Sequence, residues 1–159
     1  MSEYTISQVY PTDKTVLAQI DTLLGQEGIR RDGNLDYICA MFDEEYNVIG
    51  TGSCFGNTLR CLAVSKDHQG EGLLNEIITH LINVQFERGN IHLFVYTKTS
   101  TAKFFGDLGF YEIARVEDQV VFMENRRTGF ADYLDQLAVD KIDALKTAAI
   151  VVNANPFTL

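Results

Sequence analysis

The first residues of the chain show two different spacings of apolar side chains, one after the other. Residues 3–10, "EYTISQVY", alternate weakly between apolar and polar positions, which predicts a strand. Residues 12–28 change to a helical spacing, and Thr12 or Asp13 can cap the start of this helix. Its apolar stripe consists of Val16, Leu17, Ile20, Leu23 and Leu24.

The middle of the chain predicts three strands followed by a long helix. The strands are residues 36–43, 47–56 and 58–65, and their short connections indicate antiparallel neighbours. A loop with two glycines, residues 66–72, follows them. Residues 73–89 then carry an apolar helical stripe that ends at a glycine, so we expect an amphipathic helix. We place His80 on the solvated face of this helix.

The pattern continues with a strand, a short helix and a hairpin. Residues 91–98 predict the strand, residues 100–109 the helix, and residues 110–117 and 119–125 the two strands of the hairpin. The predicted order is therefore β–α–β–β–β–α–β–α–β–β. We infer a mixed α+β fold with one βαβ crossover around the longest helix.

Composition and charge exclude several classes of protein. A chain of 159 residues that is 46% hydrophobic suggests one domain with a normal core. Its net charge of −9 argues against nucleic acid as a partner. No apolar run reaches the roughly 20 residues of a membrane span, and the first residues do not resemble a signal peptide. We expect no membrane partner and a cytoplasmic location.

The cysteines and histidines give no sign of a metal site. Cys39, Cys54 and Cys61 are odd in number and have no CxxC spacing, so we interpret them as reduced core thiols. The histidines are scattered, with no zinc-like cluster, and we predict no metal.

The loop "KDHQGEG" lies between a predicted strand and a predicted helix. The first turn of a helix has N–H groups without helical partners and carries the positive end of the helix dipole, so it can bind an anion. Glycine lets a phosphate group approach the backbone closely. The same pattern also fits a helix start with two turn glycines and no ligand. It lacks the third glycine of the dinucleotide fingerprint and the Gly-Lys-Ser/Thr of a P-loop.

These motifs and the order of elements resemble the GNAT acetyltransferases. Their loop signature has Gln or Arg at the first position and Gly at the fourth, which Gln69 and Gly72 match. Its sixth position is a small residue, where this chain has Leu74. The stretch "TAKFFGDLGFYEI" resembles a second family motif, an aromatic pair followed by LGF. The resemblance covers about residues 1–125 and implies a mostly antiparallel sheet flanked by helices.

The resemblance also implies a binding site for acetyl-CoA or a related arm. In this family the strand before the loop holds the pantetheine arm, and the backbone of the loop holds the pyrophosphate. We expect Leu62, Ala63 and Val64 to hold the arm. We expect the pyrophosphate at Gln69, Gly70, Glu71, Gly72, Leu73 and Leu74, with Phe105 also at the site. The negative side chain of Glu71 disfavours a phosphate there unless it points into solvent.

The catalytic residues stay unassigned. The family commonly has a tyrosine in the aromatic pair, which protonates the leaving thiolate, but this chain has Phe104 and Phe105 there. Tyr96 and Tyr111 are near in sequence, and no carboxylate on the strand 58–65 offers a base. We interpret Cys61, on the same strand, as a structural thiol.

The composition changes after residue 125. We expect domain 1–126 to be GNAT-like and 127–147 to be a linker helix. Residues 148–159, "AAIVVNANPFTL", resemble the first strand of nucleotidyltransferases with an HxGH loop. A GNAT-like domain followed by such a strand resembles the citrate lyase ligases, so we expect 148–159 to be the truncated start of a second domain. Without sheet partners this strand should be irregular or pair with another chain.

That resemblance implies a function for the whole protein. Citrate lyase ligases use ATP and acetate to acetylate the thiol of a dephospho-CoA-type prosthetic group on the citrate lyase acyl carrier subunit. We expect this chain to hold that arm, and ATP to bind only through the second domain. A stand-alone GNAT enzyme that acetylates an amine, and a non-catalytic CoA-binding module, remain as alternatives.

Overall fold

The computed structural model describes residues 4–70, 72–143 and 146–151 of the chain. The chain divides into two compact units, Met1–Gly129 and Phe130–Leu159. The boundary falls within the predicted linker of residues 127–147. The first unit contains the sheet and the candidate site.

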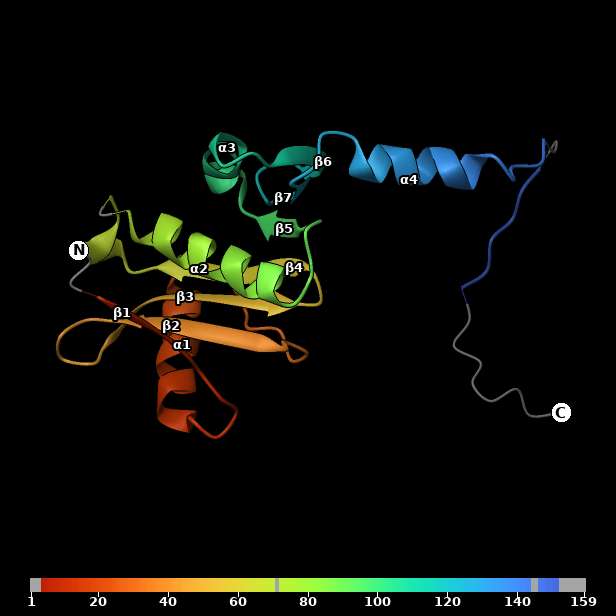
Figure 1. Cartoon of the computed structure of the whole chain (residues 1–159). Coiled ribbons are helices and arrows are strands. Elements are labelled where there is room, and N and C mark those ends of the chain that lie inside the picture. Colours follow the sequence, from red (N-terminus) through yellow and green to blue (C-terminus); the bar gives the residue numbers. More distant parts are fainter. Residues whose placement is uncertain (1–3, 71, 144–145, 152–159) are drawn as a thin grey trace, which may run out of the picture. The chain divides into compact units, whose positions relative to one another are not determined.

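The first unit has the predicted elements in the predicted order (Figure 1). They are β1 Thr5–Gln8, α1 Lys14–Gln26, β2 Tyr37–Phe42, β3 Val48–Phe55, β4 Thr58–Val64, α2 Leu73–Glu87, β5 Phe94–Thr97, α3 Thr99–Asp107, β6 Tyr111–Val116 and β7 Val120–Glu124. A short 3-10 turn, Lys66–His68, lies within the predicted loop. The apolar periodicity therefore predicted each regular element of this unit, apart from shifts of a few residues at the ends.

The strands form one sheet in the order β1-β2-β3-β4-β5-β7-β6. Strands β4 and β5 pair in parallel, and the other neighbours pair antiparallel. This confirms the mostly antiparallel sheet. The parallel pair results from α2, which connects β4 to β5 as a crossover and so places the loop before α2 at the edge where the two strands end.

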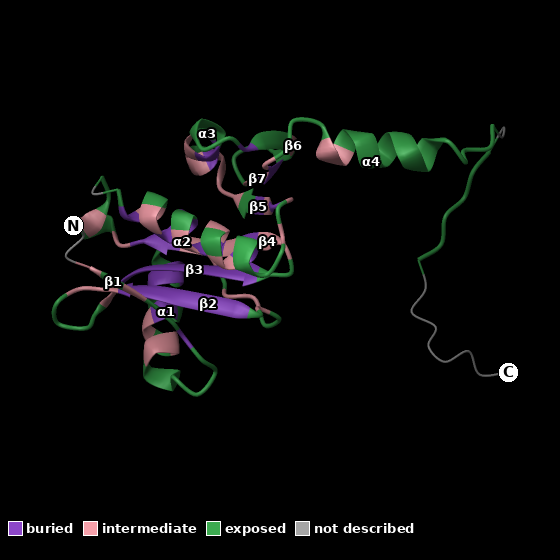
Figure 2. Ribbon diagram, viewed as in Figure 1, coloured by how far each residue is buried: buried purple, intermediate pink, exposed green. Residues whose placement is uncertain are grey.

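Two apolar cores cover the two faces of the sheet. On one face, α2 and α3 bury Ile77, Leu81 and Phe105 against β2–β5 and β7. On the other face, α1 buries Ile20 and Leu24. Figure 2 shows β2 and β3, between these layers, as largely buried. The stripes of α1 and α2 predicted from the sequence thus form the core.

The three cysteines are free and buried, as predicted. Cys39 and Cys54 belong to the core under α2, and Cys61 belongs to the core under α1. Burial raises the pKa of the Cys39 thiol to about 12. These thiols therefore stay protonated at neutral pH and act as small apolar side chains.

His80 is not the solvated surface residue that the helical pattern suggested. Its Nε2 atom lies 2.7 Å from the hydroxyl of Tyr37 on β2, and the histidine is half-buried. Burial lowers the pKa of His80. The sequence could not show this contact because the two residues are 43 positions apart.

The second unit contains most of α4, Gly129–Ala138, within the predicted linker helix. This helix buries none of its residues. Residues 148–151 form no strand, and Ile150 and Val151 are exposed. The rest of the predicted strand, residues 152–159, lies outside the described residues. In the described part of the chain, no helix has the length and apolar character needed to cross a membrane.

Candidate CoA-type binding cleft

The strands β4 and β5 pair only at their first residues. Thr58 lies opposite Phe94 and Leu59 opposite Val95, and no further β4–β5 pair forms among the described residues. Beyond this point β5 continues to pair with β7. The second half of β4 therefore presents an unpaired backbone edge toward a gap in the sheet.

A bulge in β4 lies where the two strands part. Ala63 pairs with Thr51 and Arg60 with Ser53, so two residues of β4, Cys61 and Leu62, lie opposite one residue of β3. Cys61 has a φ of 52°, a left-handed conformation that costs a non-glycine residue roughly 1–2 kcal/mol. Bulges bend a strand and increase its twist, so this one explains how β4 turns away from β5.

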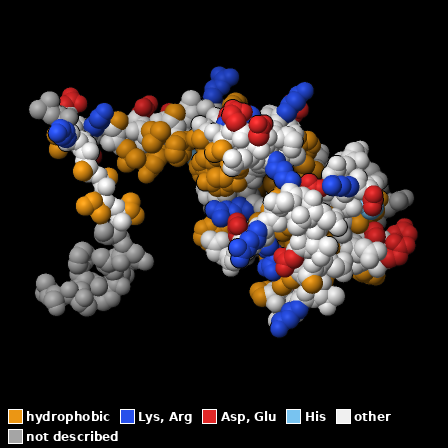
Figure 3. Space-filling view, turned by 180° about the vertical axis from the view of Figure 1, so that it is seen from behind, with side chains coloured by type: hydrophobic (Ala, Val, Ile, Leu, Met, Phe, Trp, Pro, Cys, Tyr) orange, Lys and Arg blue, Asp and Glu red, His pale blue; other side chains and the backbone are white. Residues whose placement is uncertain are grey.

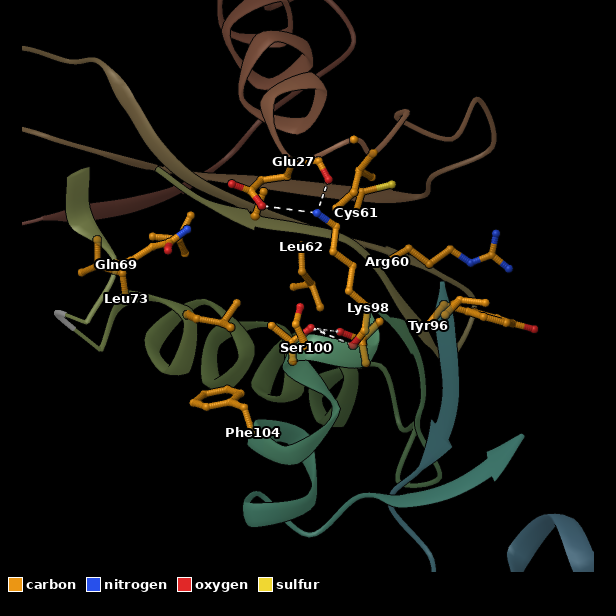
Figure 4. Close-up of a pocket in the computed structure, with 18 of the residues that line it drawn as sticks. Glu27, Arg60, Cys61, Leu62, Gln69, Leu73, Tyr96, Lys98, Ser100 and Phe104 are labelled. Carbon is orange, nitrogen blue, oxygen red and sulfur yellow. Dashed lines mark hydrogen bonds and ion pairs between the residues drawn. The ribbon is translucent and has the colours of Figure 1, made fainter. Parts of the chain in front are cut away.

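The parting strands open a cleft of about 1090 Å³ (Figure 4). Its walls come from the α1–β2 loop, β4, the loop before α2, the start of α2, the end of β5, α3 and the β6–β7 turn. The lining residues are Glu27, Gly28, Ile29, Arg30, Asp32, Arg60, Cys61, Leu62, Ala63, Val64, His68, Gln69, Gly70, Gly72, Leu73, Leu74, Asn75, Tyr96, Thr97, Lys98, Ser100, Thr101, Phe104, Gln119 and Val120.

The structure brings most of the predicted site residues together in this cleft. The strand β4, the loop before α2 and the first turn of α2 contribute these residues, which are Leu62, Ala63, Val64, Gln69, Gly70, Gly72, Leu73 and Leu74. Glu71 lies outside the described residues. Phe105 is the predicted site residue that the structure places elsewhere.

Phe105 belongs to the core and does not line the cleft. Its side chain is 1% exposed, and its ring packs edge-on against Phe104 and Phe110. Phe104 lines the cleft instead, as Figure 4 shows. Adjacent residues of a helix point about 100° apart, and in this helix Phe104 faces the cleft while Phe105 packs into the core.

The loop before α2 has the geometry of an anion site. Gly70 and Gly72 have φ values of +90° and +76°, and Gly72 is the N-cap of α2. A Cβ atom at either position would meet nothing within 4 Å, so the backbone conformation, not space, requires glycine. The first residues of α2, Leu73 to Asn75, line the cleft, and their N–H groups and the helix dipole favour a phosphate.

Arg60 is held at the side of the cleft. Its guanidinium pairs with Asp32 at 3.2 Å and lies 5.3 Å and 5.6 Å from the ring centroids of Phe55 and Tyr96. The ring of Tyr96 stacks in turn on Phe122 of β7. Figure 3 shows the first unit from behind the view of Figure 1, with hydrophobic side chains exposed in several places and Lys and Arg side chains among them.

Lys98 connects the two walls of the cleft. It follows β5, and its Nζ atom donates to the main-chain oxygen of Glu27 at the end of α1 and lies 3.3 Å from a carboxylate oxygen of the same residue (Figure 4). Neither residue was predicted from the sequence as part of the site. The two are 71 positions apart, so no local pattern could have indicated the contact.

Among the described residues that line the cleft, the structure offers no activated nucleophile. Cys61 lines it, but burial raises the pKa of this thiol, which keeps it protonated. Among the residues that the structure describes, no three His, Cys, Asp or Glu side chains form a group that could hold a metal ion.

Comparison with known proteins relates this chain to one kind of enzyme. A citrate (pro-3S)-lyase ligase from Klebsiella pneumoniae is 36% identical over 92% of the chain, and one from Escherichia coli strain K12 is 33% identical over 96%. The chain is homologous to part of citrate lyase ligase. It spans 43% of the length of each of these relatives. No protein-family model matches the chain.

Solved structures identify the fold of this citrate lyase ligase homologue as GNAT. A GNAT acetyltransferase from Staphylococcus aureus Mu50 superimposes with a TM-score of 0.62 at 15% identity, covering 76% of this chain and 97% of that one. An N-acetylglutamate synthase from Neisseria gonorrhoeae was solved with coenzyme A and N-acetyl-glutamate. It superimposes with a TM-score of 0.62 at 18% identity, covering 79% of this chain and 35% of that one. At such identities the likeness establishes the fold alone, and it confirms the fold class predicted from the sequence.

Proposed function

We propose that the cleft binds the phosphopantetheine arm of a CoA-type molecule, with its pyrophosphate at the loop before α2. The free edge of β4 is the observation that carries this proposal. Its N–H and C=O groups between Cys61 and Val64 have no partner strand on the β5 side among the described residues. Two amide groups in an extended arm can pair with such an edge as an added strand would.

The two ends of the cleft suit the two ends of such an arm. The glycine loop and the first turn of α2 provide backbone N–H groups for the pyrophosphate. His68 lines the same end, and its Nδ1 atom is buried without a hydrogen-bond partner in the described structure. The apolar side chains of Leu62 and Phe104 line the path between the loop and the point where β4 and β5 part.

We further propose that the chain is the N-terminal, arm-binding part of a citrate lyase ligase. The whole enzyme would use ATP and acetate to acetylate the thiol of a dephospho-CoA-type prosthetic group on the citrate lyase acyl carrier subunit. In that scheme ATP binds to a second domain, and the cleft presents the thiol to the activated acetate. The similarity to citrate lyase ligases over more than nine-tenths of the chain supports this proposal.

The alternative is a GNAT enzyme that acetylates an amine from acetyl-CoA. Phenylalanine at both positions of the aromatic pair disfavours it, because neither ring can protonate a leaving thiolate. Steady turnover of acetyl-CoA with small amines or peptides would support this alternative over the arm-binding function.

Calorimetric titration with CoA, dephospho-CoA and acetyl-CoA tests the proposal. Gly70→Glu places a carboxylate beside the proposed pyrophosphate and strains a backbone with a φ of +90°. We expect affinity for all three ligands to fall at least about tenfold, equivalent to about 1.4 kcal/mol.

Gly89→Glu is the matched control. Gly89 ends α2 with a φ of +84° and open space around its Cα, but it does not line the cleft. Gly89→Glu should lose about as much stability as Gly70→Glu but keep the wild-type affinity for the three ligands. Equal affinities for wild type and Gly70→Glu, or no binding of any CoA-type ligand, would refute the proposed site.

A further inference from the structure

The backbone of Lys98 is fixed at the junction between β5 and α3. Lys98 is the N-cap of α3, and its carbonyl oxygen accepts hydrogen bonds from the N–H and the hydroxyl of Thr101, each at 3.1 Å. The hydroxyls of Thr97 and Thr101 are also 2.6 Å apart. The start of the side chain is thus held firmly, while its ammonium group reaches across the cleft to Glu27 (Figure 4).

The register of the sheet places Lys98 at the sulfur end of the proposed arm. Leu59 and Val95 are the last paired residues before the strands part. Lys98 is three residues beyond Val95, and Leu62 is three residues beyond Leu59. An arm whose phosphates lie at Gly72 and whose amides follow β4 must end with its sulfur near this level, away from the anion site.

The other cations of the cleft are less suitable for contact with the sulfur. The titratable and charged residues that line it in the described structure are Glu27, Arg30, Asp32, Arg60, Cys61, His68, Tyr96 and Lys98. Arg60 is already paired with Asp32 and lies over two aromatic rings. Arg30 is exposed, and His68 lies beside the anion loop.

We propose that Lys98 pairs with the sulfur of the bound arm as a thiolate. This inference rests on the proposed function, in which the cleft binds a CoA-type arm. The S–H bond breaks, the proton leaves to solvent water and the electron pair stays on sulfur. The ammonium of Lys98 then exchanges its contact with the Glu27 carboxylate for one with the thiolate.

The physical basis is the preference of an ammonium group for the ionised thiol. A free thiol has a pKa of about 8.5, and a neighbouring lysine lowers it. Exclusion of water by the arm strengthens the attraction between the two charges. The cation would supply an activation for which the sequence shows neither a base on β4 nor a tyrosine in the aromatic pair.

Titration of the thiol of bound dephospho-CoA tests this inference. Thiolate formation is followed by ultraviolet absorbance across a pH series, with the complex of desulfo-dephospho-CoA as the blank for the protein's own groups. We expect the bound thiol to titrate at least about one pH unit below the free thiol, which means about tenfold more thiolate at neutral pH.

Four variants separate a charge effect from a structural one. Lys98→Met should return the pKa of the bound thiol to that of the free thiol, and Lys98→Arg should keep most of the lowering. Glu27→Gln should not raise the thiol pKa, because it removes negative charge. Lys103 is an exposed residue of α3, and Lys103→Met should give the same thiol pKa as wild type.

Calorimetry on the same samples shows whether a negative result concerns the binding of dephospho-CoA or only the role of Lys98. Absence of dephospho-CoA binding to wild type would overturn the proposed function and the inference with it. Binding with an unshifted thiol in wild type, or with the same shift in wild type and Lys98→Met, would overturn the role of Lys98 alone.

Discussion

Phe104 and Phe105 are adjacent in sequence, and the structure predicts different consequences when each is changed to alanine. Phe105 is 1% exposed and packs edge-on against Phe110, with ring centroids 5.5 Å apart. Truncation of such a ring leaves a core cavity, so Phe105→Ala should lower the free energy of unfolding by about 3–5 kcal/mol. Phe104 is half-buried at the cleft, and Phe104→Ala should cost about 1 kcal/mol.

Urea unfolding followed by circular dichroism measures this difference. With a slope of roughly 2 kcal/mol per molar urea, Phe105→Ala should move the midpoint down by about 2 M, and Phe104→Ala by less than about 1 M. Phe104→Ala should instead weaken the binding of dephospho-CoA. Equal midpoint shifts for the two variants, or weaker binding only in Phe105→Ala at temperatures where it is folded, would contradict the assignment of the two rings.

Two more predictions follow from contacts around α2. In Gly52→Ala the new Cβ would lie 2.7 Å from Ile77 and 2.8 Å from Leu81. This overpacking should lower the free energy of unfolding in urea by about 1–3 kcal/mol. An unfolding midpoint equal to that of wild type would contradict the packing. Burial lowers the pKa of His80 in the folded protein, so the unfolded chain binds the proton more readily and unfolding becomes easier as the pH falls below about 6.5. Unfolding curves at several pH values should show a shallower acid dependence for His80→Gln than for wild type, and identical dependence would refute the role of burial.

Local patterns were sufficient to predict the elements of the first unit. The stripes of the two longer helices repeat over several turns, and the short joints between residues 36 and 65 allow only antiparallel neighbours. The loop before α2 could be recognised because glycine and a helix start have distinct local signatures. These features depend on residues close together in sequence.

The other features of the cleft depend on contacts between distant residues. The bulge at Cys61 has no glycine to mark it, and the left-handed φ becomes visible only in the structure. The orientation of the aromatic pair could not be read from the sequence, because α3 has only 9 residues and offers too few apolar positions to define a stripe. Lys98 and Glu27 meet only because β5 and the end of α1 form opposite walls of the cleft.

The charges of the cleft bear on the choice between a thiol and an amine as the reacting group. An amine acceptor reacts as the neutral base. A nearby lysine ammonium disfavours the protonated amine, but it cannot accept the amine's proton and gains no opposite charge to pair with. A thiol gains from the same ammonium, because the reactive form is an anion. The geometry that links Lys98 to Glu27 across the cleft thus favours a thiol nucleophile, which is the group that the proposed ligase reaction acetylates.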